Sequence, residues 1–115
     1  MKRGDVYWAE LVPRSGSDQT RRRPVIVISH DGFNETPGWR SVIVIPISTS
    51  GAQARRGPSV VELDRGIGGL PAQSFALCHQ ITPLDRSKLS RRIGTLPAPA
   101  LTNVEEGLRD AMELT

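Results

Sequence analysis

The feature that most constrains the fold is a run of four β-branched residues, 25–28 (Val-Ile-Val-Ile), directly after Pro24. An unbroken apolar run of this length predicts a strand buried on both faces. Pro24 fixes its own φ and restricts Arg23 to an extended backbone. The preceding loop carries Asp18 and three consecutive arginines, residues 21–23. The sequence therefore predicts a polar loop with reactive groups, anchored to a rigid core strand.

The rest of the chain reads as short strands followed by one helix. Further strands are predicted over residues 5–11, 41–47, 59–64, 74–81 and 91–96, and a single helical turn over 85–89. Leu101, Val104 and Leu108 recur at spacings of three and four, which predicts an amphipathic helix beginning after Pro97 or Pro99, with a capping box at residues 102–105. One helix is too few for parallel crossovers, so we expect a mainly β fold: a small antiparallel barrel with the helix on one side.

Length and charge narrow the class of protein. The 115 residues suffice for a single domain, residues 1–115, with one modest core. Residues 1–100 contain 14 Lys/Arg against 8 Asp/Glu, and 13 of the 15 basic residues of the chain are arginines. Such a surface suits nucleic acid, although an arginine-rich solvated surface would look the same. No apolar stretch reaches the roughly 18 residues of a membrane span, and the N-terminus lacks a signal-peptide core, so we expect a cytoplasmic protein without a membrane partner.

The residue types leave little room for cofactor chemistry. His30 and His79 lack partners at metal-ligand spacing, and no phosphate-binding glycine motif or nucleophile elbow is present. The single cysteine, Cys78, reads as a small buried residue, and His79 as an imidazole packed on a strand face. An acid, several arginines and loop hydroxyls remain. These groups suit metal-free and cofactor-free phosphodiester cleavage, in which the 2′-hydroxyl of RNA is the nucleophile.

Several motifs occur in the order and spacing of one known family. They are residues 3–8, 16–19, 23–29, 44–49 and 80–81, followed by Leu84, Asp85 and Leu89. With them the chain resembles the MazF/PemK (Kid-like) toxins of type II toxin-antitoxin modules over nearly its whole length. The resemblance implies an SH3-like barrel of the MazF/CcdB type that forms a homodimer. It also implies a sequence-specific endoribonuclease that cuts single-stranded RNA, leaves a cyclic phosphate, and is inhibited by an acidic, MazE-like antitoxin.

The same resemblance assigns the catalytic candidates. Arg23 matches the family's arginine before proline, which stabilises the transition state and transfers a proton; its alternative is a structural ion pair. Ser48 falls where many members have a catalytic threonine, and because Thr49 is adjacent, the hydroxyl that holds the phosphate stays open. Asp18 takes the place of a glutamate, with a shorter side chain, and its alternative is a loop cap.

Seven further residues are candidate RNA contacts. Gln19 and Gln80 would hold the loop or read a base, Ser74 resembles a strand hydroxyl near the site, and Arg55 and Arg56 would contact phosphates unless they are simply solvated. Phe33 and Trp39 would stack on unpaired bases or, alternatively, cover the end of the barrel.

Two other functions fit a barrel of this kind. A CcdB-like gyrase poison would use a dimer surface and the C-terminal helix, and would not need Arg23 or the loop hydroxyls. A non-catalytic RNA- or peptide-binding barrel would keep the basic face without the acid and hydroxyl set.

Overall fold

The computed structural model describes residues 1–11, 21–52 and 57–114. Within these ranges seven strands form one antiparallel sheet, as the patterning predicts. The strands are β1 (Asp5–Leu11), β2 (Arg21–Val27), β3 (Ser41–Ser48), β4 (Val60–Leu63), β5 (Ser74–Leu77), β6 (Thr82–Asp85) and β7 (Leu89–Thr95). The helices are α1 (Asp31–Asn34) and α2 (Ala98–Met112). No helix among the described residues is long and apolar enough to cross a membrane.

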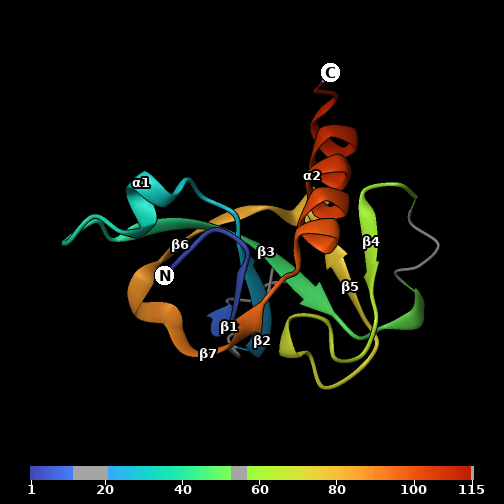
Figure 1. The fold of residues 1–115 in the computed structure, drawn as a ribbon, viewed down its shortest axis with the longest axis horizontal. Coiled ribbons are helices and arrows are strands. Elements are labelled where there is room, and N and C mark those ends of the chain that lie inside the picture. The colour runs from blue at the N-terminus through green and yellow to red at the C-terminus, as the bar shows by residue number, and fades with distance from the viewer. Residues whose placement is uncertain (12–20, 53–56, 115) are drawn as a thin grey trace.

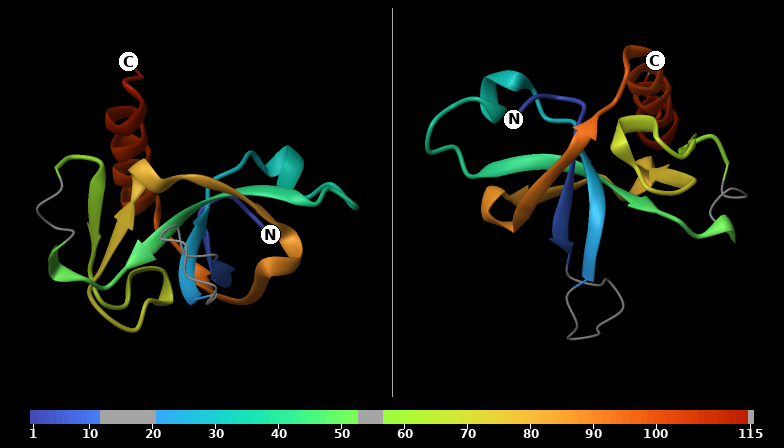
Figure 2. Two further views of the ribbon diagram at one scale, coloured as in Figure 1. Left: turned by 180° about the vertical axis from the view of Figure 1, so that it is seen from behind. Right: turned by 60° about the horizontal axis from the view of Figure 1, so that its bottom comes forward.

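The sheet bends because β3 changes partner along its length. The strand order is β4-β5-β3-β2-β1-β7, and β6 pairs with the first half of β3. Residues 41–44 of β3 face β6, whereas Ile47 and Ser48 face β5. The two halves of β3 thus belong to diverging parts of the sheet, which gives the coiled, barrel-like shape seen in Figure 1. Strands β1 and β2 extend from it as a pair (Figure 2).

Both faces of the central strands are covered, as predicted for residues 25–28. Ile26 and Ile28 belong to a core cluster that includes Val104 and Leu108 of α2. Val25 and Val27 point the other way, into a second cluster with Ala9, Val42 and Val44. Successive side chains of this segment therefore point to opposite faces of the sheet, and both faces are buried. The position of β2 is fixed from both sides, which anchors Arg23 at its start.

Helix α2 packs closely on the sheet beside β4 and β5 (Figure 1). A Cβ added to Gly107 would lie 2.8 Å from both Cys78 Sγ and Val61 Cγ2, so only glycine permits this approach. The predicted capping box at residues 102–105 is wrong. The helix begins one turn earlier, at Ala98, because Pro99 is tolerated in the first turn, where backbone N–H groups have no helical partner.

Arg3 and Asp5 join the N-terminus to three other elements. Arg3 forms an ion pair with Glu105 of α2 at 2.7 Å and donates from Nε to the carbonyl of Ile28. Asp5 is buried and accepts hydrogen bonds from the Lys2 backbone and the Thr95 hydroxyl. These residues of the family-like N-terminal motif are therefore structural.

Other sequence predictions need correction. The strand predicted over residues 74–81 ends at Leu77, and a 3₁₀ turn, Cys78–Gln80, follows. His79 is consequently exposed and not packed on a strand face, whereas Cys78 is buried as predicted. Strand β6 was not predicted because it is short and contains Pro83. It forms because it pairs with β3. The turn predicted over 85–89 is present, with Asp85 as its cap.

Candidate active site

Arg23 and Ser48 each lie two residues beyond the last pair of the β2–β3 ladder, Val25 with Pro46. The two strands pair Val27 with Val44, and Val25 with Pro46. Continuing this register by two residues places Arg23 opposite Ser48. Directly opposed residues of an antiparallel pair share a face, with Cα atoms about 4.5–5.5 Å apart. Strand alternation assigns both side chains to the side of the sheet that carries Val25 and Val44.

The fold holds the backbone of Arg23, and its guanidinium has no partner among the residues that the structure describes. Its backbone is held by pairing with Ala9 of β1 and by Pro24, and its side chain is half-buried. Within residues 1–11, 21–52 and 57–114 it makes no hydrogen bond or ion pair. A fixed but unpartnered guanidinium is suited to binding an anion, because its planar donors match phosphate oxygens.

Arg22, one residue earlier, behaves differently. It pairs with Glu10 in the ladder and therefore points to the other side of the sheet from Arg23. Its guanidinium carbon lies 5.9 Å from the ring centroid of Trp8, and it donates a hydrogen bond to Ser90 Oγ at 3.1 Å. Arg22 thus has structural partners, and of these two neighbouring arginines only Arg23 is available for a ligand.

The two candidate hydroxyls differ in orientation. Ser48 shares the face of Arg23, and its Oγ accepts a hydrogen bond from the Ser50 backbone N–H at 3.1 Å. This bond leaves the hydroxyl proton of Ser48 for another acceptor. Thr49 follows the last residue of β3 and is exposed; by strand alternation it points to the opposite side. The geometry therefore groups Ser48, and not Thr49, with Arg23.

Ser74 and Gln80 lie on β5 and just beyond it. Ser74 is buried, and its hydroxyl donates to the Ala72 carbonyl at 2.8 Å, which stabilises the entry to the strand. Ser74 has the same parity as Ala76, a member of the helix-side core, so it faces away from Arg23. Gln80 closes the 3₁₀ turn after β5, is half-buried, and lies 3.5 Å from His79 Nε2.

Phe33 and Trp39 lie at the far end of the same two strands. Their rings stack at 4.9 Å between centroids with an interplanar angle of 24°, and their exposed fractions are 46% and 43%. The β2–β3 connection that carries them starts about 20 Å from Arg23, at 3.3 Å per strand residue. Within one copy of the chain, the structure does not bring this aromatic pair to Arg23 and Ser48.

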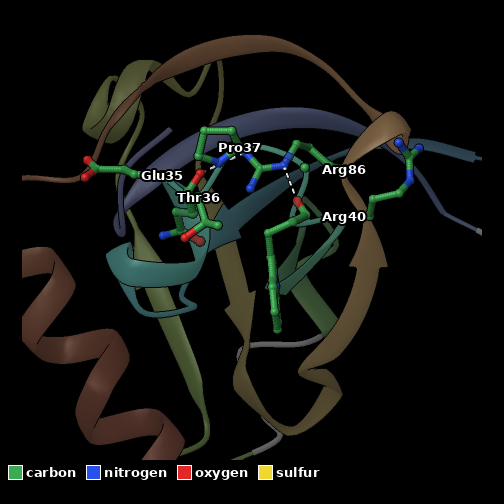
Figure 3. Close-up of a pocket in the computed structure, with 8 residues that line it drawn as sticks. Glu35, Thr36, Pro37, Arg40 and Arg86 are labelled. Carbon is green, nitrogen blue, oxygen red and sulfur yellow. Dashed lines mark hydrogen bonds between the residues drawn. The ribbon is translucent and has the colours of Figure 1, made fainter.

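Arg86 stabilises this distant loop, a role that no motif in the sequence indicates. Its guanidinium donates to the carbonyls of Phe33, Asn34 and Trp39 at 3.2, 2.8 and 2.9 Å. A pocket of about 300 Å³ lies beside it, lined by residues 34–40 and Arg86 (Figure 3). Arg40 at the rim is paired with Asp85 at 3.0 Å. Both arginines at this end are occupied by protein groups.

Four of the candidates fall outside the described residues: Asp18, Gln19, Arg55 and Arg56. Among the residues that are described, no three His, Cys, Asp or Glu side chains gather as metal ligands would. Burial raises the pKa of the Cys78 thiol to about 11, and Cys78 Sγ faces the Val104 carbonyl. Cys78 is therefore a protonated core thiol and not a nucleophile.

Comparison with known proteins places this geometry in a family. Residues 2–112 match the family model described as "PemK-like, MazF-like toxin of type II toxin-antitoxin system". The chain belongs to this toxin family. It is 32% identical over 114 residues to the endoribonuclease MazF6 of Mycobacterium tuberculosis, covering 99% of this chain and 98% of that protein. It is 33% identical to the endoribonuclease EndoA of Bacillus subtilis, over 99% of this chain and 96% of EndoA.

Solved structures of the toxin family share the fold. The toxin MazF-mt6 of Mycobacterium tuberculosis superposes with a TM-score of 0.76 and 25% identity, covering 96% of this chain and 98% of that one. A mycobacterial endoribonuclease solved with its cognate antitoxin gives 0.77 at 17% identity, over 100% of this chain and 97% of that chain, and supports the fold alone. The predicted SH3-like barrel of MazF type with a C-terminal helix is confirmed. Since the named relatives are endoribonucleases, a gyrase poison on this barrel is not favoured.

Proposed function

We propose that this member of the toxin family is a metal-independent endoribonuclease whose Arg23 and Ser48 hold the phosphate that is cut. The family match and the endoribonuclease relatives support the activity. The observation that carries the site is the register of β2 and β3. It sets an unpartnered guanidinium opposite a hydroxyl whose proton has no acceptor among the described residues. The proposal is that both side chains bind oxygens of one phosphate.

The proposed reaction uses the RNA itself as the nucleophile. The 2′-hydroxyl loses its proton and attacks the adjacent phosphorus, the bond from phosphorus to the 5′-oxygen breaks, and that oxygen takes up a proton. The products are a 2′,3′-cyclic phosphate and a 5′-hydroxyl. Arg23 stabilises the negative charge that grows on the phosphate oxygens, and the Ser48 hydroxyl donates a hydrogen bond to one of them. Since Pro24 and the pairing with β1 fix the backbone of Arg23, only its side chain has to adjust to the phosphate.

The remaining site assignments extend this proposal. Asp18 would accept or return a proton, and Thr49 would contact the RNA from beyond Ser48. The proposed RNA contacts from the rest of the chain are Gln19, Arg55, Arg56 and Gln80. Ser74 is not among them, because it is buried and its hydroxyl donates to the Ala72 carbonyl. A role for Phe33 and Trp39 in base stacking stays a prediction; it requires an RNA that reaches well past the cut, or a second copy that brings the aromatic pair closer.

Two protein partners and a compartment belong to the proposal. An acidic, MazE-like antitoxin would cover the basic groove and compete with RNA, in line with the antitoxin-bound neighbour. A homodimer is part of the proposal through the family resemblance, and its interface would cover exposed apolar side chains such as Ile43, Met112 and Leu114. Substrate and antitoxin are both expected in the cytoplasm, where we place the protein.

A substituted RNA tests the chemistry directly. The purified protein, in excess EDTA, should cut a long single-stranded RNA at a recurrent short sequence and leave cyclic phosphate ends. A matched RNA carrying one 2′-deoxynucleotide immediately before the cut should resist cleavage there and still be cut at other sites. Cleavage at the deoxy position, or only when divalent metal is added, would contradict the proposed mechanism.

A further inference from the structure

The face that carries Arg23 and Ser48 continues across two more strands. Ser48 of β3 pairs with Phe75 of β5, and Phe75 pairs with Glu62 of β4. Directly opposed residues share a face, so Ser48, Phe75 and Glu62 form one row across three strands. Continuing the β2–β3 register by two residues adds Arg23 to the same face. At about 4.8 Å per strand, the Cα atom of Glu62 lies roughly 10 Å from that of Ser48. Strands β4 and β5 stand beside the end of β3 in Figure 1.

A hydrogen bond independently shows which way Glu62 points. Gln73 lies just before β5, and its Nε2 donates to Glu62 Oε1, so the two side chains lie on the same side of the sheet. Both side chains are exposed. A carboxylate only accepts hydrogen bonds, so the amide nitrogen of Gln73 must face it. The pair thus presents carboxylate acceptors next to a remaining amide N–H donor.

We propose that Glu62 and Gln73 read a guanine next to the phosphate that is cut. The Watson–Crick edge of guanine offers two adjacent donors, N1–H and the 2-amino group, beside the O6 acceptor, which matches the carboxylate and the amide N–H. Adenine and cytosine offer one amino group next to an acceptor, and uracil one N–H between two acceptors. In single-stranded RNA this edge is free to be read. The inference rests on the proposed function, since it needs a scissile phosphate at Arg23 and Ser48.

Inosine provides the test, because it is guanine without the 2-amino group. The cut sequence of the wild-type protein is first mapped, and each invariant guanine in it is replaced by inosine. At one of them, wild-type cleavage should slow about tenfold or more, the effect of losing a hydrogen bond to a charged group. In the Glu62→Gln variant the same replacement should slow cleavage less than twofold.

Glu10→Gln is the matched control. Glu10 is exposed on β1 and pairs with Arg22, on the other side of the sheet, so this variant should keep the full inosine effect. A cut sequence without an invariant guanine, or a Glu62→Gln variant with wild-type sensitivity to inosine, would overturn the inference. The inference would also be overturned if the Glu62→Gln protein were folded but lost cleavage equally at every sequence, because Glu62 would then act as a general base. Absence of any wild-type cleavage would instead overturn the proposed function.

Discussion

The two ends of the β2–β3 pair use arginine in opposite ways. At the far end, Arg86 donates to three loop carbonyls and Arg40 is paired with Asp85. At the near end, Arg23 has no partner among the described residues and lies opposite the Ser48 hydroxyl. The three residues have the same side chain and charge, so their different roles cannot be read from the sequence.

This difference in hydrogen bonding distinguishes arginines that stabilise the fold from one that can bind a ligand. A guanidinium whose donors are satisfied by backbone carbonyls stabilises a loop and has little left for a ligand. A half-buried guanidinium without a protein acceptor still has N–H donors to satisfy, and the oxygens of a bound anion would accept from them. We therefore expect substitutions at the near end to change cleavage and those at the far end to change stability.

The largest effect is expected for Arg23→Ala. Removing a donor that stabilises transition-state charge typically costs about 10²–10³ in rate, and we expect kcat/KM for RNA cleavage to fall by that amount. The free energy of unfolding should change by less than about 0.5 kcal/mol, since no partner is lost. Arg91→Ala, an exposed arginine on β7, is the control and should cut normally. Equal loss in both variants would mean that only general charge matters.

Next in size is the contrast between the two neighbouring hydroxyls. Ser48→Ala should slow cleavage about tenfold or more, because the phosphate loses a charge-assisted hydrogen bond. Ser48→Thr should restore most of the rate, and Thr49→Ala should stay within about twofold of wild type. Single-turnover cleavage rates measure all three. A larger loss of rate in Thr49→Ala than in Ser48→Ala would indicate that the phosphate binds on the other side of β3.

At the far end, Arg86→Ala should lower the free energy of unfolding by about 2 kcal/mol, because three carbonyls lose a charged donor. Urea unfolding measures this, and kcat/KM should be unchanged. Arg40→Ala, which removes only an exposed ion pair, should cost about 0.5 kcal/mol or less. If Arg86→Ala instead abolished cleavage in a stable protein, the division between the two ends would fail.

The smallest effect is a pH dependence confined to the far end. Hydrogen bonds from the backbone and side chain of Ser87, then from Arg40, lower the pKa of Asp85 from 3.8 to about 2. Because the folded state favours the carboxylate, this contribution is full above pH 3.8 and is lost as the pH falls toward 2. The urea midpoint of the wild type should therefore drop more steeply between pH 4 and 2 than that of Asp85→Asn. Parallel curves would show that Asp85 has no such role.

Patterns that depend on neighbouring residues could be predicted from the sequence. The β-branched run at 25–28, the 3₁₀ turn capped by Asp85 and the apolar spacing of α2 all follow from local rules. Helix α2 begins directly after Pro97, one of the two predicted starts, because Pro99 is tolerated in a first turn; the capping box predicted at 102–105 was wrong. Strand β6 owes its order to β3, and a short segment with Pro83 shows no such dependence in sequence.

The site was predictable in its residue types but not in its grouping. Arg23 and Ser48 share a face because of the pairing register between β2 and β3, which depends on the 30–40 loop and on the core, and not on either residue alone. A shift of one residue would have grouped Arg23 with Thr49. Register likewise brings in Glu62, whose isolated sequence position carries no signal.

The central claim is that Arg23 and Ser48 bind the same phosphate. A crystal structure with an RNA made uncleavable by a 2′-O-methyl group at the cut nucleotide tests it most directly. The account predicts that oxygens of the scissile phosphate lie about 3 Å from both the Arg23 guanidinium and Ser48 Oγ. A scissile phosphate bound elsewhere, with Arg23 and Ser48 both out of its reach, would contradict it.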